Sequence, residues 1–188
     1  MAVAGLLLAA GAGRRFGGPK ALATDPDGTS WLRRSVAVLR EGGCAELTVV
    51  LGAEADRAAA LLVEDADVTV VHAEDWAEGM GASLRTGLAE LSARTRPCEA
   101  ALVHLVDLPD VGAAVVARLL GRAAGPGVLA RASYGGVPGH PVLIGRDHWP
   151  PVLASASGDR GARRHLAAHP HDLVECGDLA TGGDRDTR

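Results

Sequence analysis

The sequence is poor in cysteine, and this scarcity excludes two kinds of scaffold. Only three of the 188 residues are cysteines, Cys44, Cys98 and Cys176. Their number is odd, they lie far apart and no two form a CxxC pair, so neither a disulfide framework nor a zinc site follows from them. We expect buried thiols in a reducing compartment, the cytoplasm.

Long apolar runs and an excess of positive charge are also missing. The first apolar stretch, residues 3–10, is far shorter than the ~20 residues that span a bilayer, and no basic segment precedes it as in a signal peptide. The formal net charge of −4 argues against a general nucleic-acid binder, which needs a basic face. A basic cluster (Arg14, Arg15 and Lys20) in an acidic chain indicates a small anionic ligand. We therefore expect neither nucleic acid nor membrane as a partner.

What the chain does contain is a regular alternation of apolar segments. Four short runs rich in Val and Leu are continuous rather than alternating, which is typical of strands covered on both faces: residues 3–10, 46–52, 67–72 and 100–109. Segments with helical spacing lie between them, and the one that begins near Trp31 has Thr29 or Ser30 as a candidate N-cap and Gly42 as a stop. Strand and helix alternate over roughly the first 125 residues. This order predicts a three-layer α/β/α, Rossmann-like domain with a mostly parallel sheet.

After Gly127 the rhythm changes. Residues 128–146 hold two strand-like pieces around a Gly/Pro turn, which predicts a small β-hairpin excursion, and a helix over 158–169 and a strand over 172–177 follow. We expect residues 1–188 to form a single domain. Ligands of such sheets bind beyond the carboxyl ends of the strands, so the loop after residue 10 and the acidic end of VHLVDLP should meet at one mouth.

The loop after the first strand has three possible interpretations. A P-loop needs GxxxxGK followed by Ser or Thr, but Pro19 follows Gly18 and no hydroxyl comes after Lys20. A dinucleotide fingerprint, GxGxxG, has Phe16 at its third glycine position. In the third interpretation, small residues let backbone N–H groups face a triphosphate, while Arg15 and Lys20 neutralise phosphate charge as a P–O bond breaks.

The string from Leu8 to Lys20, LAAGxGxRxGxxK, resembles the signature of the nucleotidyltransferases that include the molybdenum cofactor cytidylyltransferases and guanylyltransferases. The resemblance extends along nearly the whole chain and implies a fold of the nucleotide-diphospho-sugar transferase type. It implies a nucleotide site at Leu8, Ala9, Ala10, Gly11, Gly13, Arg15 and Lys20. WAEGMGASLRTGL, residues 76–88, is similar to the family's stretch at the nucleotide pocket, which adds Gly81 and Ser83. A plain helix N-cap is the alternative interpretation of Ser83.

Asp107 ends a buried strand, where a carboxylate and substrate phosphates suit Mg²⁺. In the family the aspartate at this strand end binds the metal, so Arg15, Lys20 and Asp107 are the implied catalytic residues. We interpret Asp110 as the N-cap or a first-turn acid of the next helix.

Two further segments resemble the side of the family's site that receives the acceptor. His140, in GGVPGHPVLIGRDHW, is placed to reach the mouth, with a half-buried structural histidine as the alternative. Asp159, in GDRGARRHL, is the other candidate, and capping of its helix would also explain it. Arg160 and Arg163 could line an anionic pocket there. His165 and His169 are spaced i,i+4 but lack HExxH and a third ligand, which argues against zinc.

The C-terminal end departs from the family pattern. Relatives tend to have D-x-D-T-P-E-D before a closing helix, whereas this chain has GGDRDTR. By position Asp186 is the second metal ligand, with Asp184 as its neighbour or alternate. The missing proline, acidic pair and helix leave a frayed, solvated acidic tail as the alternative.

The resemblance implies a Mg²⁺-dependent enzyme that transfers a nucleoside monophosphate to a phosphorylated acceptor and releases pyrophosphate. The Ala-Ala-Gly form of the loop favours CTP over GTP, and the implied acceptor is molybdopterin, with transient contact with a molybdoenzyme. A sugar phosphate or phospholactate as acceptor, and a non-catalytic cofactor-binding chaperone, remain as alternatives.

Overall fold

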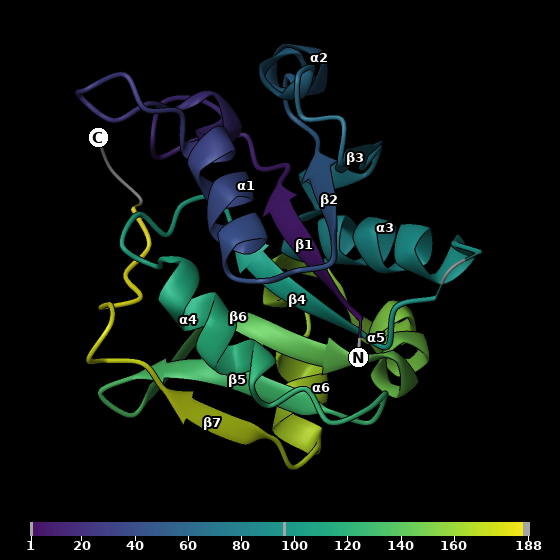
Figure 1. Cartoon of the computed structure of the whole chain (residues 1–188). Coiled ribbons are helices and arrows are strands. Elements are labelled where there is room, and N and C mark those ends of the chain that lie inside the picture. The colour runs from purple at the N-terminus through teal and green to yellow at the C-terminus, as the bar shows by residue number, and fades with distance from the viewer. Residues whose placement is uncertain (1, 96, 186–188) are drawn as a thin grey trace.

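The computed structural model describes residues 2–95 and 97–185. Its centre is one seven-stranded sheet with the strand order β3-β2-β1-β4-β6-β5-β7 (Figure 1). The first four strands are parallel to one another, β6 is antiparallel to both of its neighbours, and β7 is parallel to β5. The predicted mostly parallel sheet is therefore confirmed.

The elements follow the order expected from the sequence, except that the predicted helix over 158–169 is divided at Gly161 into a 3₁₀ helix, Gly158–Arg160, and a short α-helix. The strands are β1 (Val3–Ala9), β2 (Glu46–Leu51), β3 (Val68–His72), β4 (Ala100–Leu105), β5 (Leu129–Tyr134), β6 (Val137–Gly145) and β7 (Asp172–Glu175). The α-helices are α1 (Trp31–Glu41), α2 (Ala55–Ala59), α3 (Met80–Ala93), α4 (Ala113–Leu120), α5 (Trp149–Ser155) and α6 (Arg163–Ala168).

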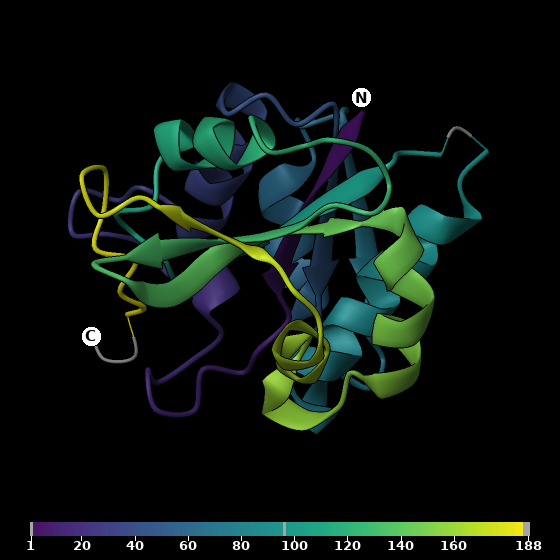
Figure 2. The same cartoon turned by 90° about the horizontal axis from the view of Figure 1, so that it is seen from below.

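Helices cover both faces of the sheet and form two cores (Figures 1 and 2). On one face, α1 and α4 bury Leu32, Leu39 and Leu119 against the sheet. On the other, α3, α5 and α6 bury Leu88, Trp149 and Leu166. Every residue of β1 is buried, which is why its sequence is an unbroken apolar run.

Helix α1 begins as predicted, and its N-cap is Ser30 rather than Thr29. The Ser30 hydroxyl accepts a hydrogen bond from the backbone N–H of Arg33 at 3.4 Å. Gly42 ends the helix and packs against Val116 of α4, where a Cβ atom would lie only 2.3 Å from a Val116 methyl carbon. The glycine stop therefore also permits the close approach of two helices.

The hairpin of residues 128–146 is not an excursion from the sheet. Its strand β6 pairs with β4, from Ala100 opposite Gly145 to Val103 opposite Val142, and β5 pairs with β6 on the far side. The hairpin joins the sheet because its apolar side chains are buried there. Val142, Leu143 and Ile144 are each at most 3% exposed and complete both cores. The hairpin thereby brings His140 beside the carboxyl end of β4. Within the part of the chain that the structure describes, no helix is long and apolar enough to cross a membrane.

Candidate functional site

The loop between β1 and α1 is held by its own backbone and by one buried aromatic ring. The N–H groups of Gly17 and Gly18 donate to the carbonyl oxygen of Gly13 at 2.9 and 3.1 Å. Gly13 has a φ of 56°, and a Cβ there would lie 1.9 Å from the Gly18 oxygen, so only glycine fits. Phe16 packs on Trp31 with ring centroids 5.1 Å apart. The residue that excludes the dinucleotide fingerprint therefore anchors the loop.

This loop forms one wall of a cleft of about 540 Å³ at the carboxyl ends of β1 and β4. The opposite wall comes from the segment around the start of α3. The lining residues are Leu8, Gly11, Ala12, Gly13, Arg14, Arg15, Phe16, Lys20, Trp76, Ala77, Gly79, Met80, Ser83, Leu105, Val106, Asp107 and Asp159. The loop and the end of β4 thus meet at one mouth, as parallel strands require.

An ion pair joins the two sides of this cleft. The Nζ of Lys20 donates to Oδ2 of Asp107 at 2.7 Å, and the side chains are 14% and 17% exposed. A short 3₁₀ helix, Lys20–Leu22, holds the lysine, and the end of β4 holds the aspartate. Residues 87 positions apart are therefore brought into contact where a phosphate and a metal ion would each find an opposite charge.

Most of the predicted nucleotide-site residues line the cleft, and three do not. Leu8, Gly11, Gly13, Arg15, Lys20 and Ser83 are in its wall. Ala9 and Ala10 are buried behind it, and the carbonyl of Ala10 accepts from the N–H of Ala53 at 3.0 Å. Gly81 packs against the backbone of Ser157, 2.6 Å from where its Cβ would be, so its position is explained by close packing.

Ser83 is not the N-cap of α3. The helix begins at Met80 after Gly79, whose φ of 113° suits glycine, and Ser83 lies in the first turn. The N-cap interpretation is therefore wrong, and the Ser83 hydroxyl group lies in the wall of the cleft.

Helix capping likewise fails to explain Asp159 and Asp110. Asp159 belongs to a 3₁₀ helix, Gly158–Arg160, and α6 begins after Ala162 without a side-chain cap. Asp159 instead lines the cleft next to Gly79. Asp110 precedes α4, whose N-cap is Gly112, and accepts from the backbone N–H and the hydroxyl of Thr181 at 2.6 and 2.5 Å. It tethers the C-terminal segment.

That C-terminal segment is bound to the site over its described length, which contradicts the frayed-tail interpretation as far as Arg185. The N–H of Arg185 donates to the carbonyl oxygen of Asp107 at 3.0 Å. Its guanidinium binds Asp25 at 3.1 Å and lies 5.5 Å from the centre of the Trp31 ring. Asp184 lines a groove with Trp31 and Pro109. Asp186, the predicted second metal ligand, lies outside the described residues.

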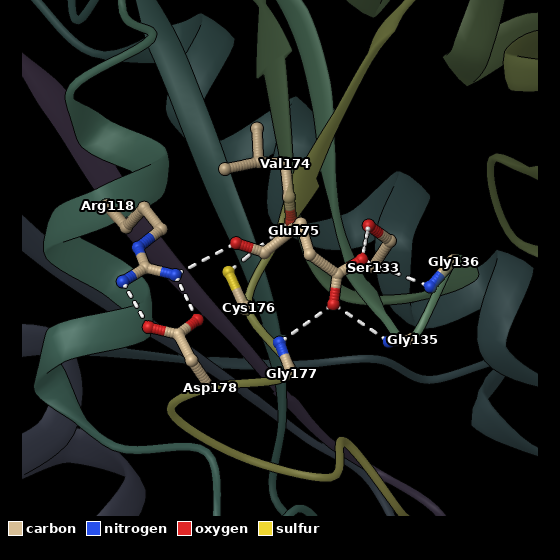
Figure 3. Close-up of polar contacts among 9 residues, drawn as sticks. All are labelled: Arg118, Ser133, Gly135, Gly136, Val174, Glu175, Cys176, Gly177 and Asp178. Carbon is tan, nitrogen blue, oxygen red and sulfur yellow. Dashed lines mark hydrogen bonds and ion pairs between the residues drawn. The ribbon is translucent and has the colours of Figure 1, made fainter.

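The start of this segment is fixed by two carboxylates (Figure 3). Glu175, at the end of β7, accepts from the hydroxyl of Ser133 and from the N–H groups of Gly135, Gly136 and Gly177 at 2.8–3.0 Å. These hydrogen bonds lower the pKa of Glu175 to about 2. Asp178 forms a two-bond pair with Arg118 of α4 at 2.5 and 2.8 Å. The tail therefore leaves the sheet in a defined direction, toward the loop that precedes α1.

His140 lines a second, smaller cavity beside the cleft, together with Asp159, Arg160 and Arg163. Burial lowers its pKa to about 4, and the positive charges of Arg131 and Arg163 act in the same direction. The imidazole is therefore neutral near pH 7.

A second neutral histidine lies under the site. His104 of β4 is 1% exposed, and within the described residues neither of its ring nitrogens has a hydrogen-bond partner. Burial lowers its pKa to about 3. Its position three residues before Asp107 makes it part of the strand that carries the aspartate.

Within residues 2–95 and 97–185, no group of three His, Cys, Asp or Glu side chains is arranged to hold a metal ion. His148, His165 and His169 pack their rings together, with a ring-nitrogen contact of 2.9 Å between the first two. Asp107 contributes a hard carboxylate oxygen in the cleft, a donor that suits Mg²⁺ when phosphate oxygens and water complete the shell.

Sequence reasoning missed several residues of the site. Trp76 and Met80 lie in the quoted WAEGMGAS stretch and line the cleft. Arg131 of β5 lines the smaller cavity. Trp76 and Met80 look like ordinary core residues in the sequence, and no local motif marks Arg131, since strand pairing alone brings it beside His140.

Comparison with known proteins places these features in a family. A family model described as "MobA-like NTP transferase domain" matches residues 5–173. Nicotine blue oxidoreductase of Paenarthrobacter nicotinovorans is 39% identical over 196 residues, which cover 98% of this chain and 92% of that protein.

Two solved structures of one mycobacterial protein share the fold. Rv0371c of Mycobacterium tuberculosis H37Rv superposes with a TM-score of 0.78 at 30% identity, over 100% of this chain and 94% of that one. Its complex with manganese gives a TM-score of 0.75 at 27% identity, over 98% and 94% of the two chains. The architecture of this chain is thus shared with both structures over nearly its whole length.

Proposed function

Since the chain belongs to the MobA-like NTP transferase domain family and is a nucleotidyltransferase of that type, we propose that it transfers CMP from CTP to a phosphorylated acceptor and releases pyrophosphate. The observation that carries this proposal is the contact between Lys20 and Asp107 across a cleft walled by the Gly11–Gly18 loop. A cation and a carboxylate face each other there at the carboxyl ends of β1 and β4.

The residues of the cleft divide the work. Gly11 and Gly13 allow the backbone to approach a triphosphate closely, and Arg15 and Lys20 neutralise the charge that grows on it. Ser83 and Trp76, on the opposite wall, contact the nucleoside. A phosphate acceptor is already anionic, so the protein has to position the reactants and neutralise charge rather than remove a proton.

We propose Mg²⁺ as the metal, held by Asp107 and Asp186. The manganese complex of Rv0371c supports a divalent ion in a related protein. When bound, the ion would neutralise charge on the phosphates of the nucleotide. With the metal held by Asp107, the Lys20 ammonium group would be available to the phosphates.

Molybdopterin is the proposed acceptor and CTP the proposed donor, both on the sequence resemblance. The N–H of Arg185 donates to the carbonyl oxygen of Asp107, so the C-terminal segment is held beside the cleft as far as Arg185, and a carrier without turnover is left to the test. The test is pyrophosphate release with CTP, GTP, ATP and UTP, each paired with molybdenum cofactor, a sugar phosphate and phospholactate. Pyrophosphate release with CTP and molybdenum cofactor supports the proposal. Pyrophosphate release with another pair instead would identify that pair as the substrates.

One relative favours a second candidate function. The relative that is 39% identical is named for an oxidoreductase activity, so the same cleft could bind a nucleotide-containing redox cofactor. The protein is incubated with NADH or NADPH and a dye acceptor, and the loss of reduced nicotinamide is followed by its absorbance. This measurement distinguishes a redox reaction from nucleotidyl transfer. Cofactor oxidation without pyrophosphate release from any pair would favour the redox reaction.

A further inference from the structure

A small cavity adjoins the nucleotide cleft on the side of β6 and α6. Its volume is about 50 Å³, and it shares Leu8, Met80 and Asp159 with the cleft. Its apolar wall consists of Leu84, Val103, Val142, Ile144 and Leu166. One water needs roughly 10–15 Å³ of such volume, so the cavity accommodates a group of a few heavy atoms but no nucleoside.

Three arginines and one aspartate line this cavity, so its described lining carries an excess of positive charge. Arg131 comes from β5, Arg160 from the 3₁₀ helix before α6, and Arg163 from the first turn of α6. Among the residues that the structure describes, none of the three forms an ion pair with a carboxylate. Asp159 is the one acid in the described lining.

Other partly buried arginines of this protein form ion pairs with carboxylates. Arg34, with a side chain 22% exposed, pairs with Asp25, and Arg94, 16% exposed, pairs with Glu46. Arg131 is also partly buried, yet among the described residues its Nε and Nη2 donate to a single acceptor, the carbonyl oxygen of Gly139, at 3.2 and 3.1 Å. Burial and the charge of Arg163 lower the pKa of Arg131, which is the electrostatic sign of an uncompensated cation.

His140 adds a neutral donor or acceptor to this group of cations. It faces Arg131 and Arg163, and it stays uncharged near pH 7 for the reasons given above. A bound anion would therefore meet guanidinium forks, which match carboxylate and phosphate oxygens in pairs, and one imidazole nitrogen.

We propose that this cavity binds an anionic group of the acceptor other than the phosphate that reacts, with Arg131 and Arg163 as its specificity-determining residues. The inference rests on the proposed function. Asp107 lines the cleft and not this cavity, so an anion here is distinct from a phosphate reacting beside Asp107. The acceptor class that follows is a phosphorylated molecule with a second acidic group, a phosphate or a carboxylate. Phospholactate has such a group and molybdopterin does not, so within the proposed nucleotidyl transfer this inference favours the alternative acceptor.

Neighbouring arginines on α6 provide a matched pair of variants. Arg163 and Arg164 are both exposed and share the first turn, but only Arg163 lines the cavity. Arg163→Gln tests the site, Arg164→Gln controls for the loss of one positive charge, and Arg131→Lys keeps the charge while removing the fork. Both glutamine variants change exposed side chains and should fold, as circular dichroism would verify.

The first measurement needs no turnover. Inorganic phosphate and acetate are titrated separately into the full chain while the imidazole signals of His140 are followed by NMR. We expect a saturable shift that weakens at least tenfold in Arg163→Gln and Arg131→Lys and is unchanged in Arg164→Gln. The anion that binds more tightly identifies the acidic group. No saturable shift, or equal weakening in Arg164→Gln, would overturn the proposal.

The second measurement separates this inference from the proposed function. With an active substrate pair, Arg163→Gln should raise the acceptor KM at least tenfold while the nucleotide KM stays the same. An unchanged acceptor KM in an active enzyme overturns the inference and leaves nucleotidyl transfer intact. Arginine-dependent anion binding without pyrophosphate release from any pair overturns the proposed function and leaves the anion site intact.

Discussion

The nucleotide cleft and the small cavity beside it are both lined by cations, but they balance that charge differently. In the cleft, Lys20 is paired with Asp107 at 2.7 Å. In the cavity, the three arginines have no carboxylate partner within the described chain. The cleft therefore offers both a carboxylate and cations, which suits phosphates together with a metal ion, whereas the cavity offers mainly guanidinium groups, which suit an anion alone.

Removal of the acid from the cleft should have the largest effect. Asp107→Asn leaves Lys20 without its carboxylate and deprives the metal of a ligand, so kcat should fall on the order of 10²–10³-fold. Pyrophosphate release measures this, with thermal unfolding as the control for the fold. An unchanged rate in a folded variant would mean that Asp107 takes no part in the reaction. The carboxylate that distinguishes the cleft from the cavity would then have no role in catalysis.

Removal of the cation tests the other half of the pair. Lys20→Ala should lower kcat/KM roughly 10²-fold, because charge neutralisation on the phosphates is lost. Arg14→Ala is the matched control: Arg14 also lines the cleft but is exposed, so a change of a few-fold at most is expected. A larger loss in Arg14→Ala than in Lys20→Ala would mean that the loop presents its other side to the nucleotide.

The buried histidines predict a stability that falls with acid. The unfolded chain takes up a proton on each histidine below about pH 6.5, while His104 and His140 stay neutral in the fold down to pKa values of about 3 and 4. Stability is therefore full above about pH 6.5 and decreases as the pH falls through this window, by at most about 1.4 kcal/mol per pH unit for each histidine.

Denaturant unfolding between pH 7 and 4.5 measures this slope. His104→Leu should flatten it by less than half, since His140 and His165, whose pKa burial also lowers, still contribute, and His72→Gln at an exposed position is the control. An equally steep slope in His104→Leu would assign the acid sensitivity to other groups.

The smallest effect is expected at the tail. Arg185→Ala removes the bond to Asp25 and the contact with Trp31, which loosens the residue that precedes Asp186. The Mg²⁺ concentration for half-maximal rate should rise about three-fold, with a loss of stability below about 1 kcal/mol because the pair is partly exposed. Arg122→Ala, an exposed arginine, provides the control. An unchanged Mg²⁺ requirement would mean that the C-terminal segment does not contribute to metal binding.

The sequence predicts the sheet and the cleft well because both depend on local patterns. Continuous apolar runs specify buried strands, and the strand that ends at Asp107 must meet the loop after β1. The loop signature placed Arg15 and Lys20 in the cleft wall. Gly81 was assigned to the nucleotide because a motif does not distinguish a glycine that faces a ligand from one that faces Ser157.

Residues that act through distant pairing could not be predicted. Arg131 reaches its cavity through the register of β5 with β6, and Asp110 finds Thr181 across 71 residues. Both involve contacts that no spacing encodes. Capping, a local rule, was the wrong interpretation for Asp110, Asp159 and Ser83, since in each case the helix begins at another residue.

The bond between the Arg185 backbone and the Asp107 carbonyl also has a practical consequence for anyone who handles this protein. An affinity tag or reporter inserted directly after Arg185 would begin next to a residue that contacts the end of β4. A histidine tag in that position would carry its own metal ligands to the neighbourhood of Asp107. A purification handle placed before β1 would lie at the amino ends of the parallel strands, which is the end of the sheet away from the cleft.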